Sequence, residues 1–173
     1  FSKIPFTGTM MWIGSLAIIG FPYFSGYYSK ESILENAYFS SSILAQYAYI
    51  IGVLTALLTA FYSWRLLFMT FHGESRAAEN VYLHAQESPK VMTVPLAILA
   101  IGSIFSGMFL SDFFIGEKQD FFWHYAIVLA NGENHHMPFI QILIIKSSVG
   151  LGVLIAALIY FYKTNLSEVL SDN

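Results

Sequence analysis

The chain has 173 residues, of which 56% are apolar and only 11% are Asp, Glu, Lys or Arg. Soluble domains carry about 25% charged residues, so too few are present here to cover a water-facing surface. The absence of cysteine excludes disulfides and thiolate-bound iron–sulfur clusters, and a net charge of −3 without a basic cluster argues against binding of nucleic acid. The high content of aromatic residues, 17%, suits contact with lipid. The composition therefore predicts an integral membrane protein.

Four stretches of the chain are apolar enough and long enough to cross a bilayer as helices, which takes about 20 residues each. They lie at about residues 6–41, 46–71, 90–111 and 137–162. This pattern predicts an all-α, polytopic membrane protein with about four transmembrane helices. Because the chain starts at Phe1 and the apolar segments follow one another, we expect residues 1–173 to be a fragment of a longer transmembrane domain.

The first segment is expected to be discontinuous, because Gly20 and Pro22 interrupt its apolar run. Proline lacks a backbone donor and clashes with the preceding turn, and glycine weakens the preference for helix. A second half-helix, from about Lys30 to Ser41, should follow the break. Its first residues include serines that can cap a helix and acidic residues that suit the start of one.

The depth of Lys30 in the membrane has two interpretations. If residues 10–29 form one straight helix of about 30 Å, Lys30 lies at the far interface as an ordinary terminal lysine. If the two half-helices span the membrane together, Lys30 lies near mid-depth. Transporters use such broken helices with an ionisable group, because unwound backbone is tolerated only where it lines a cavity. Desolvation disfavours the charged form of a lysine placed there, so that it can exchange protons.

Polar residues of the second segment are candidates for a proton path. Thr59 and Tyr62 share one helix face with Thr55 and could hold ordered water beside Lys30. Bonding of the threonine hydroxyls to carbonyls of their own helix is an equally common alternative. His72 ends the segment and titrates near neutral pH, so it is either a member of the path or a cation at the helix C-terminus.

Lys146 is the only charged residue of the fourth apolar segment. It follows Pro138 by about 12 Å of helix, and we expect its side chain to reach the nearby membrane interface. The five histidines fall mainly in two loops that should lie on opposite sides of the membrane, so no metal site is expected.

The basic residues near the segment ends indicate the orientation. One side of the membrane is expected to hold five of them and the other side two. The five are Lys3, Arg65, Arg76, Lys90 and Lys163, and the two are Lys30 and Lys118. Cytoplasmic loops carry the excess of Lys and Arg. Both ends of the chain are therefore expected to face the cytoplasm or the mitochondrial matrix.

Three runs of residues together resemble a known family. They are Met11 to Glu35, with Gly20-Phe21-Pro22 and Ser29-Lys30-Glu31, then Thr59 to Gly73, and Glu87 to Leu96. The runs are similar to the antiporter-like subunits of respiratory complex I, and most similar to the L subunit of NADH–quinone oxidoreductase, called subunit 5 in mitochondria. The resemblance covers most of residues 6–110. The chain departs from the family pattern at Tyr23, where proline is frequent, and at Gln86, where histidine is frequent.

The resemblance implies the activity and the site. In that family the serine–lysine–acid step lies in a broken helix, and the lysine belongs to a chain of protonatable groups across the membrane. Lys30 would then be the proton carrier and Glu31 its modulator, with Thr59, Tyr62 and His72 supporting the path. The chain would be part of a proton-translocating subunit of an enzyme complex, NADH–quinone oxidoreductase.

The resemblance also implies the surroundings of the chain. The other membrane-arm subunits of complex I and the lipid bilayer would be its partners, and nucleic acid would not. Its place would be the bacterial or mitochondrial inner membrane. We expect no nicotinamide, flavin or quinone to bind to this chain, because the redox chemistry belongs to other subunits.

Two other functions remain open at this point. A subunit of a multisubunit sodium/proton antiporter shares the broken helix and the lysine. A membrane scaffold without transport would use Lys30 only as an interfacial residue, and it would keep any proton transport intact when Lys30 is removed.

Overall fold

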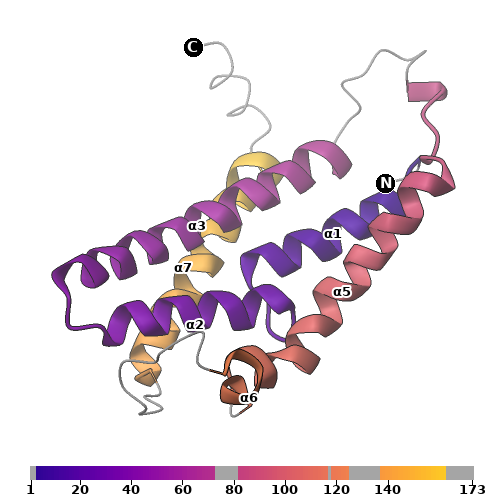
Figure 1. Cartoon of the computed structure of the whole chain (residues 1–173). Helices are drawn as coiled ribbons and strands as arrows, with labels where there is room; N and C mark the ends of the chain where they lie inside the picture. The colour runs from indigo at the N-terminus through magenta and orange to yellow at the C-terminus, as the bar shows by residue number, and fades with distance from the viewer. Residues whose placement is uncertain (1–2, 73–81, 117, 125–136, 163–173) are drawn as a thin grey trace.

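The computed structural model describes residues 3–72, 82–116, 118–124 and 137–162, and the described part contains helices and no strand. The elements are α1 (Pro5–Ile19), α2 (Ser25–Phe39), α3 (Ile43–Phe71), α5 (Lys90–Phe114), the short α6 (Gln119–Trp123) and α7 (Phe139–Ala157), which continues as the π-helical turn η1 (Leu158–Tyr162). Figure 1 shows the break between α1 and α2. The predicted all-α architecture with a discontinuous first segment is confirmed.

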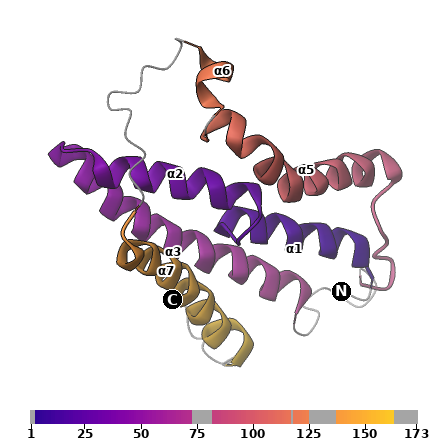
Figure 2. The ribbon, with the colours of Figure 1, turned by 90° about the horizontal axis from the view of Figure 1, so that it is seen from below.

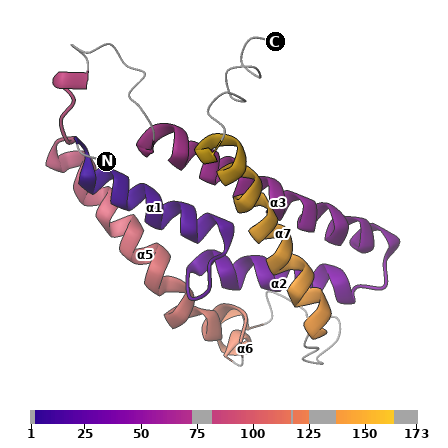
Figure 3. The same ribbon diagram turned by 180° about the vertical axis from the view of Figure 1, so that it is seen from behind.

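Within the described residues, three helices are long and apolar enough to cross a membrane, namely α3, α5 and α7 with most of η1. The two halves of the first segment have 15 residues each, or about 22 Å, which is less than the ~30 Å of a bilayer core. The two halves follow one another along the 29 residues of α3, which runs back beside both of them (Figures 1 and 3). Together the two halves therefore run the length of one spanning helix, which is the arrangement expected of a discontinuous fourth span.

The broken segment occupies the centre of the bundle. It lies between α5 on one side and α3 on the other, as Figure 2 shows, and contacts both helices through α1 and through α2. Helix α7 packs on α3, and its first half crosses toward α2 in Figure 3. The break between α1 and α2 is thus surrounded by helices from the rest of the chain.

Hydrogen bonds tie the segments together at both ends of the bundle. At one end, the carboxylate of Glu87, just before α5, accepts bonds from residues at the start of α1. At the other end, Glu35 Oε1 accepts a bond of 3.0 Å from the backbone N–H of Met137, just before α7. Successive spans therefore alternate in direction. Which end faces the cytoplasm or matrix stays a prediction.

Small residues dominate the contacts between helices. The buried apolar residues of the described part include Ala17, Ala56, Ala60, Ala100 and Ala156, whereas many Leu, Ile and Phe side chains point outward. In lipid there is little hydrophobic gain from burying large apolar side chains, so close approach of small residues supplies the packing. The outward apolar surface is the one expected of a protein that meets lipid or further apolar helices.

Gly152 allows α7 to approach α3 closely. A Cβ atom at this position would collide with the backbone carbonyl of Leu57 and meet Ala60 Cβ at 3.0 Å, whereas a Cβ at Gly150 would meet nothing within 4 Å. We expect Gly152→Ala to destabilise the packing by about 1–3 kcal/mol, since backbone must move to make room. Gly150→Ala on the same helix is the matched control and should be close to neutral. Thermal dissociation of the assembled protein would measure both, and equal midpoints would contradict this account of the contact.

Candidate functional site

Helix α1 ends at Gly20 because the glycine takes up the left-handed conformation, with φ 79° and ψ 44°. The N–H of Gly20 donates to Ala17 O at 3.2 Å, and the N–H of Phe21 donates to Leu16 O at 3.0 Å. This pair of bonds is the Schellman arrangement that closes helices. It leaves the carbonyl groups of Ile18 and Ile19 without a backbone donor from the following turn.

Lys30 supplies the missing donor. Its Nζ donates to Ile18 O at 3.1 Å and to Ile19 O at 3.4 Å. The C-terminus of a helix carries a partial negative charge, which favours a cation at this place. The lysine of α2 therefore caps the end of α1 across the break.

Gly26 brings the start of α2 against the end of α1. A Cβ atom at Gly26 would collide with the carbonyl oxygen of Ala17, so no larger residue fits without movement of backbone. Gly26 lies one turn before Lys30 on α2. The close contact at Gly26 thus fixes the distance over which the Lys30 side chain reaches α1.

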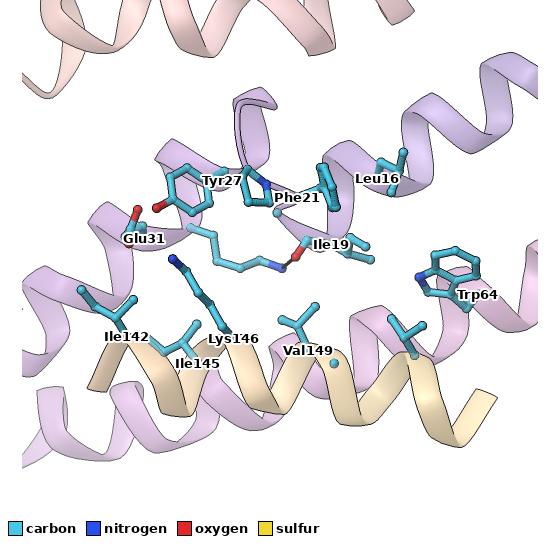
Figure 4. A pocket seen from close by; sticks show the side chains of 15 residues that line it. Leu16, Ile19, Phe21, Tyr27, Glu31, Trp64, Ile142, Ile145, Lys146 and Val149 are labelled. Carbon is cyan, nitrogen blue, oxygen red and sulfur yellow. Dashed lines mark hydrogen bonds between the residues drawn. The ribbon is translucent and has the colours of Figure 1, made fainter. Parts of the chain in front are cut away.

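A cavity of about 540 Å³ lies beside the break, bounded by α1, α2, α3 and α7. Most of its wall is apolar, and its ionisable side chains are Tyr27, Lys30, Glu31 and Lys146. Figure 4 shows Tyr27, Glu31 and Lys146 directed toward one another across it. The site therefore gathers one carboxylate and two ammonium groups in surroundings that screen charge poorly.

Trp64 of α3 forms another part of the cavity wall. Its indole Nε1 is buried and has no hydrogen-bond partner among the described residues. An unpaired buried donor costs about 1–3 kcal/mol, so this position suits a polar group or a water molecule.

Lys30 also lines a second cavity, of about 650 Å³, on its α3 side. Thr55 and Thr59 lie in the wall of this cavity, and they belong to the middle of α3. Each threonine hydroxyl donates to a carbonyl of its own helix at 2.7 Å, Thr55 to Ile51 and Thr59 to Thr55. Their oxygens still have lone pairs that can accept a bond from water.

The other two residues predicted for a proton path lie away from Lys30. Tyr62 is 52% exposed on α3 and lines neither of these two cavities. His72 follows the last residue of α3, about 20 Å of helix beyond Thr59, and its ring lies 5.7 Å from that of Trp12. The structure therefore places Thr59 near Lys30 and does not bring Tyr62 or His72 to it.

The expected burial of Lys30 is not confirmed. The residue is half-buried, and no lysine within the described ranges is buried. The physical reason is that Lys30 separates two cavities, so its stem is covered on the α1 side and remains accessible from both hollows. In the described part the lysine is held by two carbonyl groups and not enclosed by side chains.

Two acidic residues of α2 line adjoining cavities. Glu31 lines the 540 Å³ cavity and also a smaller one of about 270 Å³, whose wall includes Glu35. Glu35 in turn binds the backbone ahead of α7. No role was predicted for Glu35 from the sequence, although its spacing of four residues from Glu31 places both on one helix face.

Glu87 is a second residue that the sequence analysis did not assign. Its carboxylate caps α1 by accepting bonds from the backbone N–H of Phe6 at 2.7 Å and from the Thr7 hydroxyl at 2.7 Å. Desolvation alone raises the pKa of this carboxyl, but the hydrogen bonds from Thr7 and its neighbours lower it and prevail, so the pKa lies below its usual value. A depressed pKa means that the contact stabilises the fold at neutral pH, and this contribution is lost as the pH falls through that lowered pKa.

No group of three or more potential metal ligands is present in the part of the chain that the structure describes. Four of the ionisable side chains named above meet at one cavity, and that cavity adjoins a helix break. This combination is the candidate site.

Comparison with known proteins identifies the family. The family described as NADH dehydrogenase subunit 5 C-terminus matches residues 62–168, which is more than half of the chain. The chain belongs to this family. The resemblance predicted from the sequence is confirmed, and the match extends well beyond residue 110.

Relatives from mitochondria and bacteria agree with this family. The chain is 45% identical to NADH-ubiquinone oxidoreductase chain 5 of Phytophthora infestans, over 78% of this chain and 20% of the relative. It is 44% identical to NADH-quinone oxidoreductase subunit L of Rhodobacter capsulatus, over 76% of this chain and 19% of the relative. It is 38% identical to NADH-quinone oxidoreductase subunit L of Rickettsia bellii, over 95% of this chain and 25% of the relative.

The chain thus spans about a fifth to a quarter of the length of these relatives. The names of these relatives favour a subunit of NADH–quinone oxidoreductase over the sodium/proton antiporter subunit that the sequence alone left open.

Proposed function

We propose that this chain is part of a proton-translocating membrane subunit of NADH–quinone oxidoreductase and that Lys30 is a proton carrier in it. The observation that carries the proposal is the position of Lys30. It lies at a helix break, beside the middle of the 29-residue helix α3, between two cavities. If α3 crosses the bilayer, this level corresponds to mid-depth and not to the headgroups.

The geometry suits a group that gains and loses a proton. The carbonyl groups of Ile18 and Ile19 favour the charged form of the lysine, and the apolar cavity wall favours the neutral form. Opposing preferences of this kind bring the two forms closer in free energy than the apolar wall or the carbonyl groups alone would. A change nearby, such as a shift of Glu31, would then move the proton.

Water within the two cavities would deliver and remove the proton in this mechanism. We assign Thr59 the role of holding water beside Lys30, because it lines the same cavity and its oxygen can accept a bond. Tyr62 and His72 receive no role at Lys30, because neither lines the 540 Å³ or the 650 Å³ cavity that Lys30 lines.

The proposal includes the setting of the chain. The chain would lie in the bacterial or mitochondrial inner membrane, in contact with lipid and with the other membrane-arm subunits of complex I. It assigns no nicotinamide, flavin or quinone site to this chain, so the redox chemistry would drive protonation changes here from other subunits.

The proposal predicts that Lys30→Ala in the full protein lowers NADH-driven proton uptake by at least about tenfold, a conservative bound beside the roughly 10²–10⁴-fold that a positioned proton-transfer group contributes. Uptake by membrane vesicles, normalised to the amount of assembled complex, is the measurement. Lys90→Ala, which changes an exposed lysine at the start of α5, is the matched control. Normal uptake by an assembled Lys30→Ala protein would leave only a structural role for the lysine.

A further inference from the structure

Lys146 lines the cavity of the candidate site, and its side chain is exposed in this structure. It is the eighth residue of α7, and its Nζ lies 5.5 Å from the centre of the Tyr27 ring. Figure 4 shows its side chain directed from α7 toward Tyr27 and Glu31 on α2. The interfacial position predicted from the sequence stays a prediction, but the structure shows that the lysine lines the same cavity as Lys30.

The neighbours of Lys146 on α7 are apolar. Ile142, Ile145 and Val149 share the cavity wall with it, so its ammonium group is the one polar feature that this face of α7 presents to the cavity. The face of an aromatic ring attracts a cation, and more strongly where the pair is desolvated. Tyr27 therefore holds the Lys146 ammonium near α2.

The charges around this cavity do not balance. Helix α2 contributes Tyr27, Lys30 and Glu31, and α7 contributes Lys146, while the cavity residues of α1 and α3 are not ionisable. At neutral pH a single carboxylate thus faces two lysines. Two like charges in surroundings of low dielectric constant disfavour each other.

We propose that Lys146 is a positioning residue of the Lys30 site, whose charge competes with that of Lys30 for the carboxylate of Glu31. When Lys146 is charged and close to Glu31, Lys30 loses part of its counter-charge and releases its proton more readily. When Glu31 turns to Lys30, the proton is held. Tyr27 connects the two states, because its ring contacts Lys146 and its hydroxyl interacts with Glu31. This inference rests on the proposed function of Lys30.

The test compares four variants of the full complex in membrane vesicles. Lys146→Met removes the charge and keeps the length of the side chain, and Lys146→Arg keeps the charge. Lys30→Met tests the proposed function itself, and Lys90→Met is the control at an exposed lysine outside the cavity. NADH-driven proton uptake per assembled complex is measured from neutral to alkaline pH. If Lys146→Met does not assemble, Lys146→Gln provides a polar, neutral replacement.

We expect Lys146→Met to move the alkaline limit of proton uptake upward by about one pH unit, because a competing positive charge is removed from the cavity. Lys146→Arg should keep the wild-type profile, since the role of Lys146 depends on charge. A Lys146→Met profile equal to that of Lys90→Met, with Lys30→Met inactive, would overturn this inference and leave the proposed function standing. Equal losses in Lys146→Met and Lys146→Arg without any shift would also overturn it, because they would indicate a packing role. Normal uptake by Lys30→Met would overturn the proposed function and this inference together.

Discussion

Lys30→Arg is expected to translocate protons no better than Lys30→Ala, at least about tenfold below the wild-type rate per assembled complex. Arginine keeps the positive charge and can still donate to the carbonyl groups of Ile18 and Ile19, so the cap of α1 should survive. The guanidinium group does not release its proton at accessible pH. The arginine variant therefore separates a role in capping from a role in proton exchange, whereas Lys30→Ala removes both roles at once.

Two further variants make this result interpretable. Lys90→Arg controls for the effect of a lysine-to-arginine change at an exposed position, and it should leave proton uptake unchanged. Glu31→Gln removes a carboxylate that favours the charged form of a neighbouring lysine, and it should weaken uptake by less than the change at Lys30 does. An assembled Lys30→Arg complex that pumps at the wild-type rate would show that the charge alone suffices.

Lys30 could be assigned to the site from the sequence, whereas Lys146 could not. Lys30 is recognisable because its signals are local: the glycine and proline of the break precede it, and the serine–lysine–acid step follows in the next helix. Distance along the helix from Pro138 estimates the depth of Lys146 but not the face of α7 that carries it. That face is set by the packing of α7 on α3, which is a property of the packed bundle.

The helices themselves were predictable because their signals, like those of Lys30, are local in the sequence. Runs of apolar residues long enough to span a bilayer are a strong signal, and the helices α3, α5 and α7 with η1 cover the predicted segments closely. The contacts of Glu35 and Glu87 join residues that are 102 and about 80 positions apart, and no local pattern marks such partners. From the sequence, the hydroxyl groups of Thr55 and Thr59 could either hold water or bind carbonyl groups of their own helix. In the structure both donate to carbonyl groups of their own helix.

Gly26→Ala is expected to separate α2 from α1 and to impair both stability and proton uptake. The added methyl group would collide with the carbonyl oxygen of Ala17, which is backbone and cannot turn away as a side chain can. Overpacking of this kind costs about 1–3 kcal/mol, and here the movement would also draw Lys30 away from the carbonyl groups that hold it. The loss of proton uptake should therefore exceed the loss of assembled complex.

Gly14→Ala is the matched control, because it places the same methyl group inside α1 where nothing lies within 4 Å. Alanine in a helix interior is favoured over glycine by about 0.5–1 kcal/mol, so this variant should be neutral or slightly stabilised. The midpoint of thermal dissociation and the proton uptake per assembled complex are measured for both. If Gly26→Ala matched Gly14→Ala in both quantities, the close contact at the break would not be what holds Lys30 in place, since the two variants differ only in what the methyl group meets.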